Sequence, residues 1–227
     1  MRILHGLAEG VLRNIGGGLG MRIRTVYYRR RLASCGINLR IDVGVIIENP
    51  GNISIGNDVC ILPYTVITAR GGPHDDTGRK VIRKVNQHFR GTAGRISIGN
   101  QVAIGAYNII HGYGGLEIGD RCTTSARVSI YSYSHYPNDP DEPATVTYAN
   151  AMVDGPVVCI ESPIVLCEGV WLGLGVTVFG GCVGRNSFVA ANSQVLYNIK
   201  DNSYAAGSPA VHRRSRFATE SGDEISI

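Results

Sequence analysis

Histidine and cysteine are the side chains of this sequence that could carry acid–base or nucleophilic chemistry near neutral pH, and each occurs six times. No two cysteines form a CxxC pair, so we interpret them as reduced thiols at small core positions. His135 has the most informative context, because it ends an aromatic run and opens a Pro- and Asp-rich segment in the text IYSYSHYPNDP. An imidazole at a strand end beside a loop can accept a proton from a bound hydroxyl or amine. This context alone also fits an exposed histidine without a catalytic role.

The elements that must position His135 are indicated by a period of six residues. Large aliphatic residues recur at this spacing in four separate blocks, and a small or β-branched residue follows most of them four positions later. An α-helix repeats every 3.6 residues or so and a strand alternates, so neither explains the pattern. The repeating positions are Ile55, Ile61, Ile67; Ile98, Ile104, Ile110; Ile118, Thr124, Ile130; Ile160, Leu166, Leu172, Val178; and, after a slip of one residue, Val183, Val189, Val195.

Six residues are enough for one short strand and a corner, and three such units close a triangular coil of about eighteen residues. Successive coils would stack as parallel strands with the aliphatic side chains inside the prism. The alternative, a β-sandwich, predicts turn signals every eight to twelve residues or so and strict alternation, which the recurring sixes do not follow. We therefore predict an all-β fold, a parallel β-helix of hexapeptide repeats.

Two segments interrupt the period and two ends lie outside it. Residues 70–95 are polar, basic and Gly-rich, and residues 135–155 are rich in Pro and Asp, so both are predicted loops that leave coil corners. Residues 1–33 have helical spacing interrupted by GGG at 16–18, and we expect them to cap the open end of the stack. The predicted organisation is a helical cap at 1–33, a β-helix at 34–200 with these two loops, and a C-terminal tail at 201–227.

The charge distribution restricts the partners. The net charge is +4, and basic residues cluster near residues 22–31, 79–90 and 213–216. A nucleic-acid-binding protein usually has a stronger bias and a recognisable module, so nucleic acid is not an expected partner. Moderate clusters fit small anionic ligands or a membrane surface better, and we expect the run Tyr27–Arg31 to make a peripheral contact with anionic lipid. The opening residues do not follow a signal-peptide pattern, so we expect a cytoplasmic protein.

The segments around His135 resemble the hexapeptide-repeat acyltransferase superfamily, and within it the maltose, galactoside and capsule-sugar O-acetyltransferases. The resemblance rests on SIYSYSHYPNDP, GPVVCIESPIVLCEGVWLGLGVTVFGG and FVAANSQVLYNIKDNSYAAGSPAVHRRSRF, and covers roughly residues 50–216. It implies a left-handed β-helix and a homotrimer with sites between subunits. It also implies transfer of an acetyl group from acetyl-CoA, without a metal, to a hydroxyl of a saccharide or glycan precursor in polysaccharide biosynthesis.

The same resemblance assigns the acceptor side of the site. It implies that His135 is the general base. Asn108 lies about one coil earlier and corresponds, with a difference of one residue in spacing, to an Asn that contacts the acceptor; a polar corner residue is the alternative. His111 is expected in the same cleft as a weaker substrate contact. The acidic run from Asp139 to Glu142 either orients His135 or forms a solvated loop.

On the coenzyme side, Leu174 and Ala191 correspond to positions whose main chain contacts coenzyme A. Arg214, or Arg213 in its place, corresponds to a basic residue that meets the coenzyme phosphates; a solvated basic tail is the alternative. The chain departs from the pattern at Leu196-Tyr197, where relatives have a Thr-Lys pair. This departure weakens the expectation of detailed phosphate contacts.

Three other functions remain to be distinguished. A γ-class carbonic anhydrase has the same fold but needs three converging His ligands on zinc, two of them at HxxxxH spacing, which this sequence lacks. A non-catalytic scaffold would retain its activity without His135. An N-acetyltransferase acting on a nucleotide-linked amino sugar would use the same base, so the sequence does not distinguish a hydroxyl from an amine acceptor.

Overall fold

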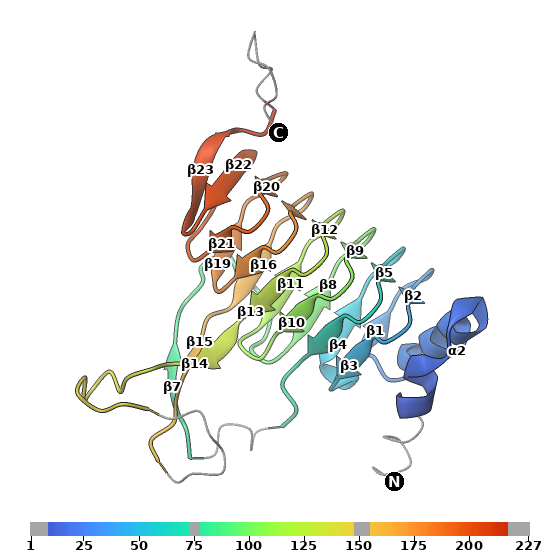
Figure 1. The fold of residues 1–227 in the computed structure, drawn as a ribbon, viewed down its shortest axis with the longest axis horizontal. Coiled ribbons are helices and arrows are strands. Elements are labelled where there is room, and N and C mark those ends of the chain that lie inside the picture. The colour runs from blue at the N-terminus through green and yellow to red at the C-terminus, as the bar shows by residue number, and fades with distance from the viewer. Residues whose placement is uncertain (1–8, 73–77, 148–154, 218–227) are drawn as a thin grey trace.

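The computed structural model describes residues 9–72, 78–147 and 155–217, and this part of the chain winds into a stack of triangular coils (Figure 1). Three parallel sheets form the sides of the prism. The first contains β1 (Ser34–Cys35), β4 (Ile53–Ile55), β8 (Ile96–Ile98), β11 (Leu116–Ile118), β16 (Ile164–Leu166) and β19 (Gly181–Val183). The second begins with β2 (Arg40–Ile41), β5 (Cys60–Ile61), β9 (Ala103–Ile104), β12 (Thr123–Thr124), β17 (Trp171–Leu172) and β20 (Phe188–Val189). The third contains β3 (Ile46–Glu48), β6 (Val66–Thr68), β10 (Ile109–His111), β13 (Ser129–Tyr131), β18 (Thr177–Val178) and β21 (Gln194–Val195).

The predicted period of six is confirmed, because consecutive members of each block fall on the three sheets in turn and point inward. Ile98, Ile104 and Ile110 are each at most 2% exposed. Equivalent residues of successive coils pair directly, as Ile110 does with Ile130. The coil length changes along the stack: Ser129 pairs with Ile109, twenty residues earlier, whereas Gln194 pairs with Thr177, seventeen earlier. This shortening accounts for the slip in the later sixes.

Ile160 is the exception to that pattern. We expected it to open a coil, but it lies in β15 (Val158–Glu161), outside the prism. The inward residues of this coil begin at Ile164, which is completely buried in the core. Spacing alone misassigned Ile160 because it precedes Leu166 by six residues in an apolar run.

The corners between sheets require left-handed backbone at one recurring position. Between the second and third sheets this position is occupied by Gly44, Tyr64, Tyr107, Arg127, Gly175 and Asn192, all with φ between 58° and 74°. Gly and Asn adopt this conformation at low cost, whereas Tyr and Arg do not. The rings of Tyr64 and Tyr107 stack at 5.2 Å on the outside of the corner, so contact between coils accompanies the strained backbone.

The N-terminal segment is helical, as predicted, with turns at 9–14 and α2 (Gly17–Arg29). The break falls at residues 15–16, since Gly17 and Gly18 already belong to α2. Arg24 is 1% exposed and joins these helices to the first coil: Nη1 donates to the carbonyls of Leu12 and Ile15, and Nε donates to the carbonyl of Ile41. Neither helix in the described ranges is long and apolar enough to span a bilayer.

The first predicted loop, residues 70–95, contains a strand, which corrects the expectation of an irregular insertion there, whereas strands flank the second predicted loop, residues 135–155. β7 (Lys80–Arg83) lies within the first insertion, β14 (Tyr133–His135) ends where the second loop begins, and β15 follows that loop. β15 pairs in parallel with β7 and antiparallel with β14, so the insertions share a three-stranded sheet outside the prism. The local sequence did not indicate this pairing because the partners are far apart along the chain.

The C-terminal boundary is also corrected. Instead of a tail from residue 201, β22 (Ser203–Gly207) continues the second sheet beside β20, and β23 (Ala210–Ser215) pairs antiparallel with it. This hairpin lies at the end of the stack opposite α2 (Figure 1). It closes one end of the prism, as the helices do at the other.

Replacement of Arg24 by Met tests how the helices are held. Met fills a similar volume but leaves the carbonyls of Leu12, Ile15 and Ile41 without their donor, so we expect a loss of about 1–3 kcal/mol in the free energy of unfolding. Urea denaturation followed by circular dichroism measures this. The matched control is Arg22→Met on the exposed side of α2, expected within about 0.5 kcal/mol of the unchanged chain. Equal stabilities of the two variants would contradict the bracing role of Arg24.

Candidate active site

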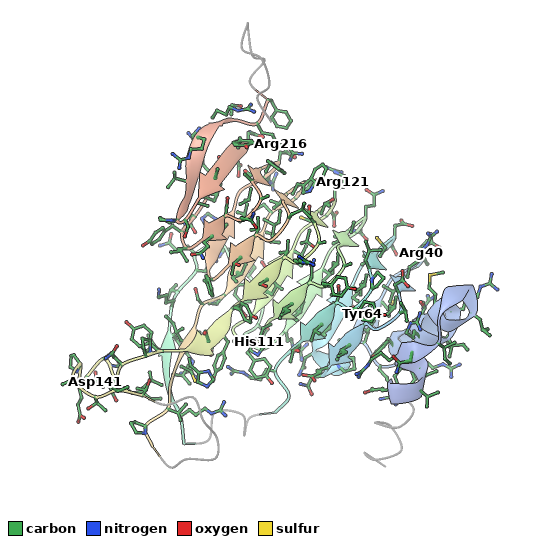
Figure 2. All side chains as sticks on the ribbon, in the orientation of Figure 1. Arg40, Tyr64, His111, Arg121, Asp141 and Arg216 are labelled. Atoms are coloured by element: carbon green, nitrogen blue, oxygen red, sulfur yellow. The ribbon has the colours of Figure 1, made fainter. Side chains whose placement is uncertain are left out.

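Both insertions leave the prism along the edge where the third sheet turns into the first, which we call the insertion edge. The first connects β6 to β8 and the second connects β13 to β16. β10 lies between β6 and β13 in the third sheet and ends in His111. The two histidines of the predicted acceptor site therefore belong to this edge, with His111 at the end of β10 on the prism (Figure 2) and His135 at the end of β14 in the small sheet.

The small sheet presents two distinct faces, because side chains alternate along a strand. In β14, Tyr133 and His135 point to one side and Ser134 to the other. The register pairs Tyr133 with Glu161 and His135 with Cys159. Opposed residues share a face, so the His135 face also carries Tyr133, Cys159 and Glu161.

His111 lies in a cluster of tyrosine rings. Its imidazole stacks on Tyr113 at 4.3 Å and 24°, and Tyr131 and Tyr133 lie 6.2 and 6.0 Å away. Its Nδ1 is buried and has no hydrogen-bond partner among the described residues. Burial lowers the pKa of His111, and the nearby His135 lowers it further. Burial and the nearby His135 both therefore favour the neutral form of the His111 imidazole.

His135 is exposed, and the acidic run that follows it does not orient its ring. Lys80 of β7 binds both Asp139 and Asp141. This contact lowers the pKa of Asp139. The carboxylate of Glu142 accepts from the hydroxyl of Thr145, and Asp141 lies toward the far end of the second insertion (Figure 2). The acidic residues connect the insertions to one another, which corrects the suggestion that they position the base.

A buried carboxylate, that of Glu161, connects the small sheet to the insertion edge. Glu161 is 3% exposed, and its Oε2 lies 3.0 Å from Nη2 of Arg70 and 3.7 Å from Nε of Arg83. Arg70 begins the first insertion and Arg83 ends β7, so one carboxylate contacts two arginines of the opposite insertion. The guanidinium of Arg70 also lies 6.0 Å from the ring centre of Tyr133. The strand that carries His135 is thus anchored close to His111.

Asn108 does not belong to this site, which corrects its assignment as an acceptor contact. Its side chain is completely buried. Nδ2 donates to Thr124 Oγ1 at 2.5 Å, and Oδ1 accepts from the Val128 amide at 2.8 Å. Both polar ends of the amide are used inside the prism, so Asn108 has the alternative role of a polar corner residue.

The predicted coenzyme residues lie on another edge. Leu174 and Ala191 are exposed at corners between the second and third sheets, on successive coils, and the Leu174 carbonyl accepts from the Asn192 amide. Arg213 and Arg214 lie on β23, where Arg213 Nε donates to the Ala206 carbonyl and Arg214 lies over the ring of Tyr204. Within one chain the histidines and the predicted coenzyme residues therefore occupy different edges of the prism.

Sequence reasoning missed a cleft of about 700 Å³ on the Ser134 face of the small sheet. The cleft lies between residues 84–87 and the coils that contain β13 and β18, where the rings of Tyr131 and Phe179 stack at 6.1 Å. The repeat pattern was the signal that could have indicated this cleft. Tyr131 directly follows the inward residue Ile130, and Phe179 directly follows the inward residue Val178. The two aromatic residues therefore occupy the same position of the six-residue repeat. Elsewhere, no three His, Cys, Asp or Glu side chains in the described ranges converge as metal ligands would.

The environment of His111 predicts an unusual titration. We expect a pKa below the ordinary value of about 6.5, because the charged imidazole would lose water and face a second imidazole. Replacement of His135 by Gln removes that second charge, so the pKa of His111 should rise. Proton NMR titration of the His111 ring measures both values. A pKa of His111 at or above the ordinary value, or no response to His135→Gln, would contradict this account.

Comparison with known proteins supports the fold. No family model matches the chain. Over 48 residues it is 42% identical to a Saccharomyces cerevisiae protein named "Putative acetyltransferase YJL218W", a match that spans 21% of this chain and 24% of that protein. AntD, an N-acyltransferase from Bacillus cereus solved with dTDP and 3-hydroxybutyryl-CoA, superposes with a TM-score of 0.63 at 20% identity, over 85% of this chain and 87% of that one.

A second solved structure is the hexapeptide-repeat acetyltransferase VCA0836 from Vibrio cholerae. It superposes with a TM-score of 0.52 at 19% identity and covers 94% of this chain and 89% of its own. Together with the stacked coils, these similarities confirm the predicted architecture. The chain therefore has the left-handed hexapeptide-repeat β-helix fold of these acyltransferases.

Proposed function

We propose that this protein transfers an acetyl group from acetyl-CoA to a hydroxyl of a saccharide or glycan precursor, with His135 as the general base. The observation that carries the proposal is the arrangement at the insertion edge. An exposed imidazole on β14 lies near a half-buried one at the end of β10, and the ion-paired Glu161 lies on β15, the strand that pairs with β14. Both solved relatives named above are acyltransferases.

The reaction requires few catalytic groups from the protein, because a thioester is already activated. His135 takes the proton of the acceptor hydroxyl as its oxygen attacks the acetyl carbonyl, and a tetrahedral oxyanion forms. Collapse of the oxyanion breaks the carbon–sulfur bond. The imidazolium of His135 then returns the proton to the departing thiolate. The products are the acetyl ester and free coenzyme A, and His135 is neutral again.

His111 complements this cycle as a second imidazole, whose pKa is lowered by burial and by the nearby His135. When His135 carries the proton, a positive charge on His111 would be opposed by both burial and like-charge repulsion. A neutral His111 can donate or accept a hydrogen bond with an acceptor hydroxyl, which suits the predicted role of a substrate contact.

The coenzyme is proposed to bind between copies of the chain. Leu174 and Ala191 occupy a different edge from the histidines, so one copy presents its insertion edge to the coenzyme edge of the next. Three copies arranged in a ring would close this interface and form three equivalent sites. Arg213 and Arg214, exposed on β23, would meet the coenzyme phosphates.

A nucleotide-linked amino sugar is the second candidate acceptor. The observation that favours it is AntD, an N-acyltransferase whose structures hold dTDP or dTDP-4-amino-4,6-dideoxyglucose with coenzyme A or its acyl derivative. The same base serves an amine, so the acceptor decides between the reactions. Thiol release from acetyl-CoA, measured against a panel of sugars, lipid-linked glycans and nucleotide-linked amino sugars, separates the two.

Replacement of His135 by Ala should lower the acetyl-transfer rate by about 10² or more, the usual effect of losing a general base. The rate of thiol release with the best acceptor of that panel measures this. His88→Ala is the matched control, because His88 is exposed on the first insertion away from the histidine pair, and its rate should not change. An unchanged rate for His135→Ala would remove the base assignment and favour a scaffold role.

The site between copies is tested by mixing two inactive variants. His135→Ala disables the insertion edge, and Leu174→Asp is designed to disable the coenzyme edge. If the oligomers are dissociated and reassembled together, about one interface in four combines the two intact edges, so about a quarter of the normal activity should return. Light scattering should show a trimer. A monomer, or no recovery of activity on mixing, would contradict a shared site.

A further inference from the structure

The outer face of α2 carries apolar and basic side chains together. Leu19 and Val26 are 68% and 52% exposed, and Arg22, Arg29 and Arg30 are exposed beside them. Positions three and four apart lie on one side of a helix, so these five residues form a continuous surface, which we call the outer stripe. Val11, 64% exposed, adds a further apolar side chain from the preceding helical turns.

The orientation of α2 is fixed by its inner face. Gly20, Arg24 and Tyr28 are buried, and the hydrogen bonds of Arg24 hold the helix to the first coil. A rotation that hid Leu19 and Val26 would expose Arg24 and break these bonds. The apolar exposure of the outer stripe is therefore a consequence of how the helix is anchored.

Contacts within the chain change the expectation that the whole run Tyr27–Arg31 contacts lipid. Tyr28 is 4% exposed, and the Tyr27 hydroxyl donates to Glu9 at 2.9 Å. The guanidinium of Arg31 lies 4.2 Å from the ring centre of Tyr27. Tyr27, Tyr28 and Arg31 are thus engaged within the chain, and the outer stripe takes their place as the available surface.

The charge of this region has one sign. Residues 10–33 contain six arginines and no Asp or Glu. Glu9, just before them, accepts the hydrogen bond of Tyr27. A partner must therefore offer negative charge to the guanidinium groups and an apolar layer to Leu19 and Val26. A bilayer surface with anionic headgroups offers both within a few ångströms of depth.

We propose that the outer stripe binds the surface of an anionic membrane, with Leu19 and Val26 entering the headgroup layer and Arg22, Arg29 and Arg30 contacting lipid phosphates. α2 lies at one end of the coil stack, so the coils do not obstruct a flat surface from reaching it (Figure 1). The site would hold the protein on the membrane by its N-terminal end. This inference does not rest on acetyl transfer.

The test is co-sedimentation of the full chain with vesicles of phosphatidylcholine alone or mixed equally with phosphatidylglycerol. We expect binding to the mixed vesicles, much weaker binding to neutral ones, and loss of most binding at high salt. Each arginine near an anionic surface contributes about fivefold in binding. The combined change Arg22→Gln, Arg29→Gln and Arg30→Gln should therefore weaken binding on the order of a hundredfold.

Two further variants distinguish binding by the outer stripe from a general effect of net charge. Arg121→Gln, Arg127→Gln and Arg185→Gln remove the same charge from exposed corners of the coils and should leave vesicle binding nearly unchanged. Leu19→Gln with Val26→Gln should weaken it several-fold while the helix, checked by circular dichroism, stays folded.

Four results would overturn the proposal. These are absence of binding to the mixed vesicles, equal binding to neutral ones, and an equal loss in the corner variant. The fourth is a changed oligomeric state of the Leu19→Gln, Val26→Gln variant by light scattering, which would make the stripe a contact between copies. Binding of double-stranded DNA in place of vesicles, with the same arginine dependence, would assign the surface to nucleic acid.

Discussion

Each strand of the prism forms its ladder of hydrogen bonds with the strands one coil before and one coil after it, and this constraint shapes the molecule. It turns position along the sequence into height along the stack. Because every third strand belongs to the same sheet, equivalent positions of successive coils must also point the same kind of side chain inward. Ile104, Ile110 and Ile130 are completely buried, and each such side chain contributes about 1.5–3 kcal/mol relative to exposure. Extra residues can be inserted where one sheet turns into the next, because the turn there can be lengthened without breaking the ladder.

The proposed site follows from this constraint, since both insertions leave at the same edge. They begin two coils apart along the third sheet, with β10 and its terminal His111 on the coil between them. β15 joins them into one sheet, and Glu161 reinforces the junction through Arg70 and Arg83. The coil carries His111, and the small sheet carries His135. Two imidazoles from different elements thus lie near one another, and burial together with His135 lowers the pKa of His111.

Much of the fold could be predicted from the sequence, because a period of six is local and repeats. The same local rule failed at Ile160, whose spacing fits a coil although its strand pairs outside the prism. The pairing of β7 with β15 depends on contact between residues about eighty apart in sequence, such as Ile82 and Ile160, which no local pattern carries. The helical cap was predictable from its spacing, but which of its faces is buried depended on the bonds of Arg24.

The candidate site was predictable to a similar extent. The context and resemblance of the His135 segment led to an edge where His111 is also found. Asn108 was assigned from the family resemblance, and its burial against Thr124 and Val128 became apparent from the three-dimensional structure. The lowered pKa of His111 arises from burial, among tyrosines of three different segments, and from a second imidazole, so no single stretch of sequence indicates it.

The most direct measurement is a structure of the assembled protein with coenzyme A bound. The account predicts that the coenzyme thiol lies within hydrogen-bonding reach of the His135 imidazole, on the face of β14 shared with Tyr133, and between two copies of the chain. A thiol bound on the Ser134 face of β14, or at an edge remote from His135 in every copy, would contradict it.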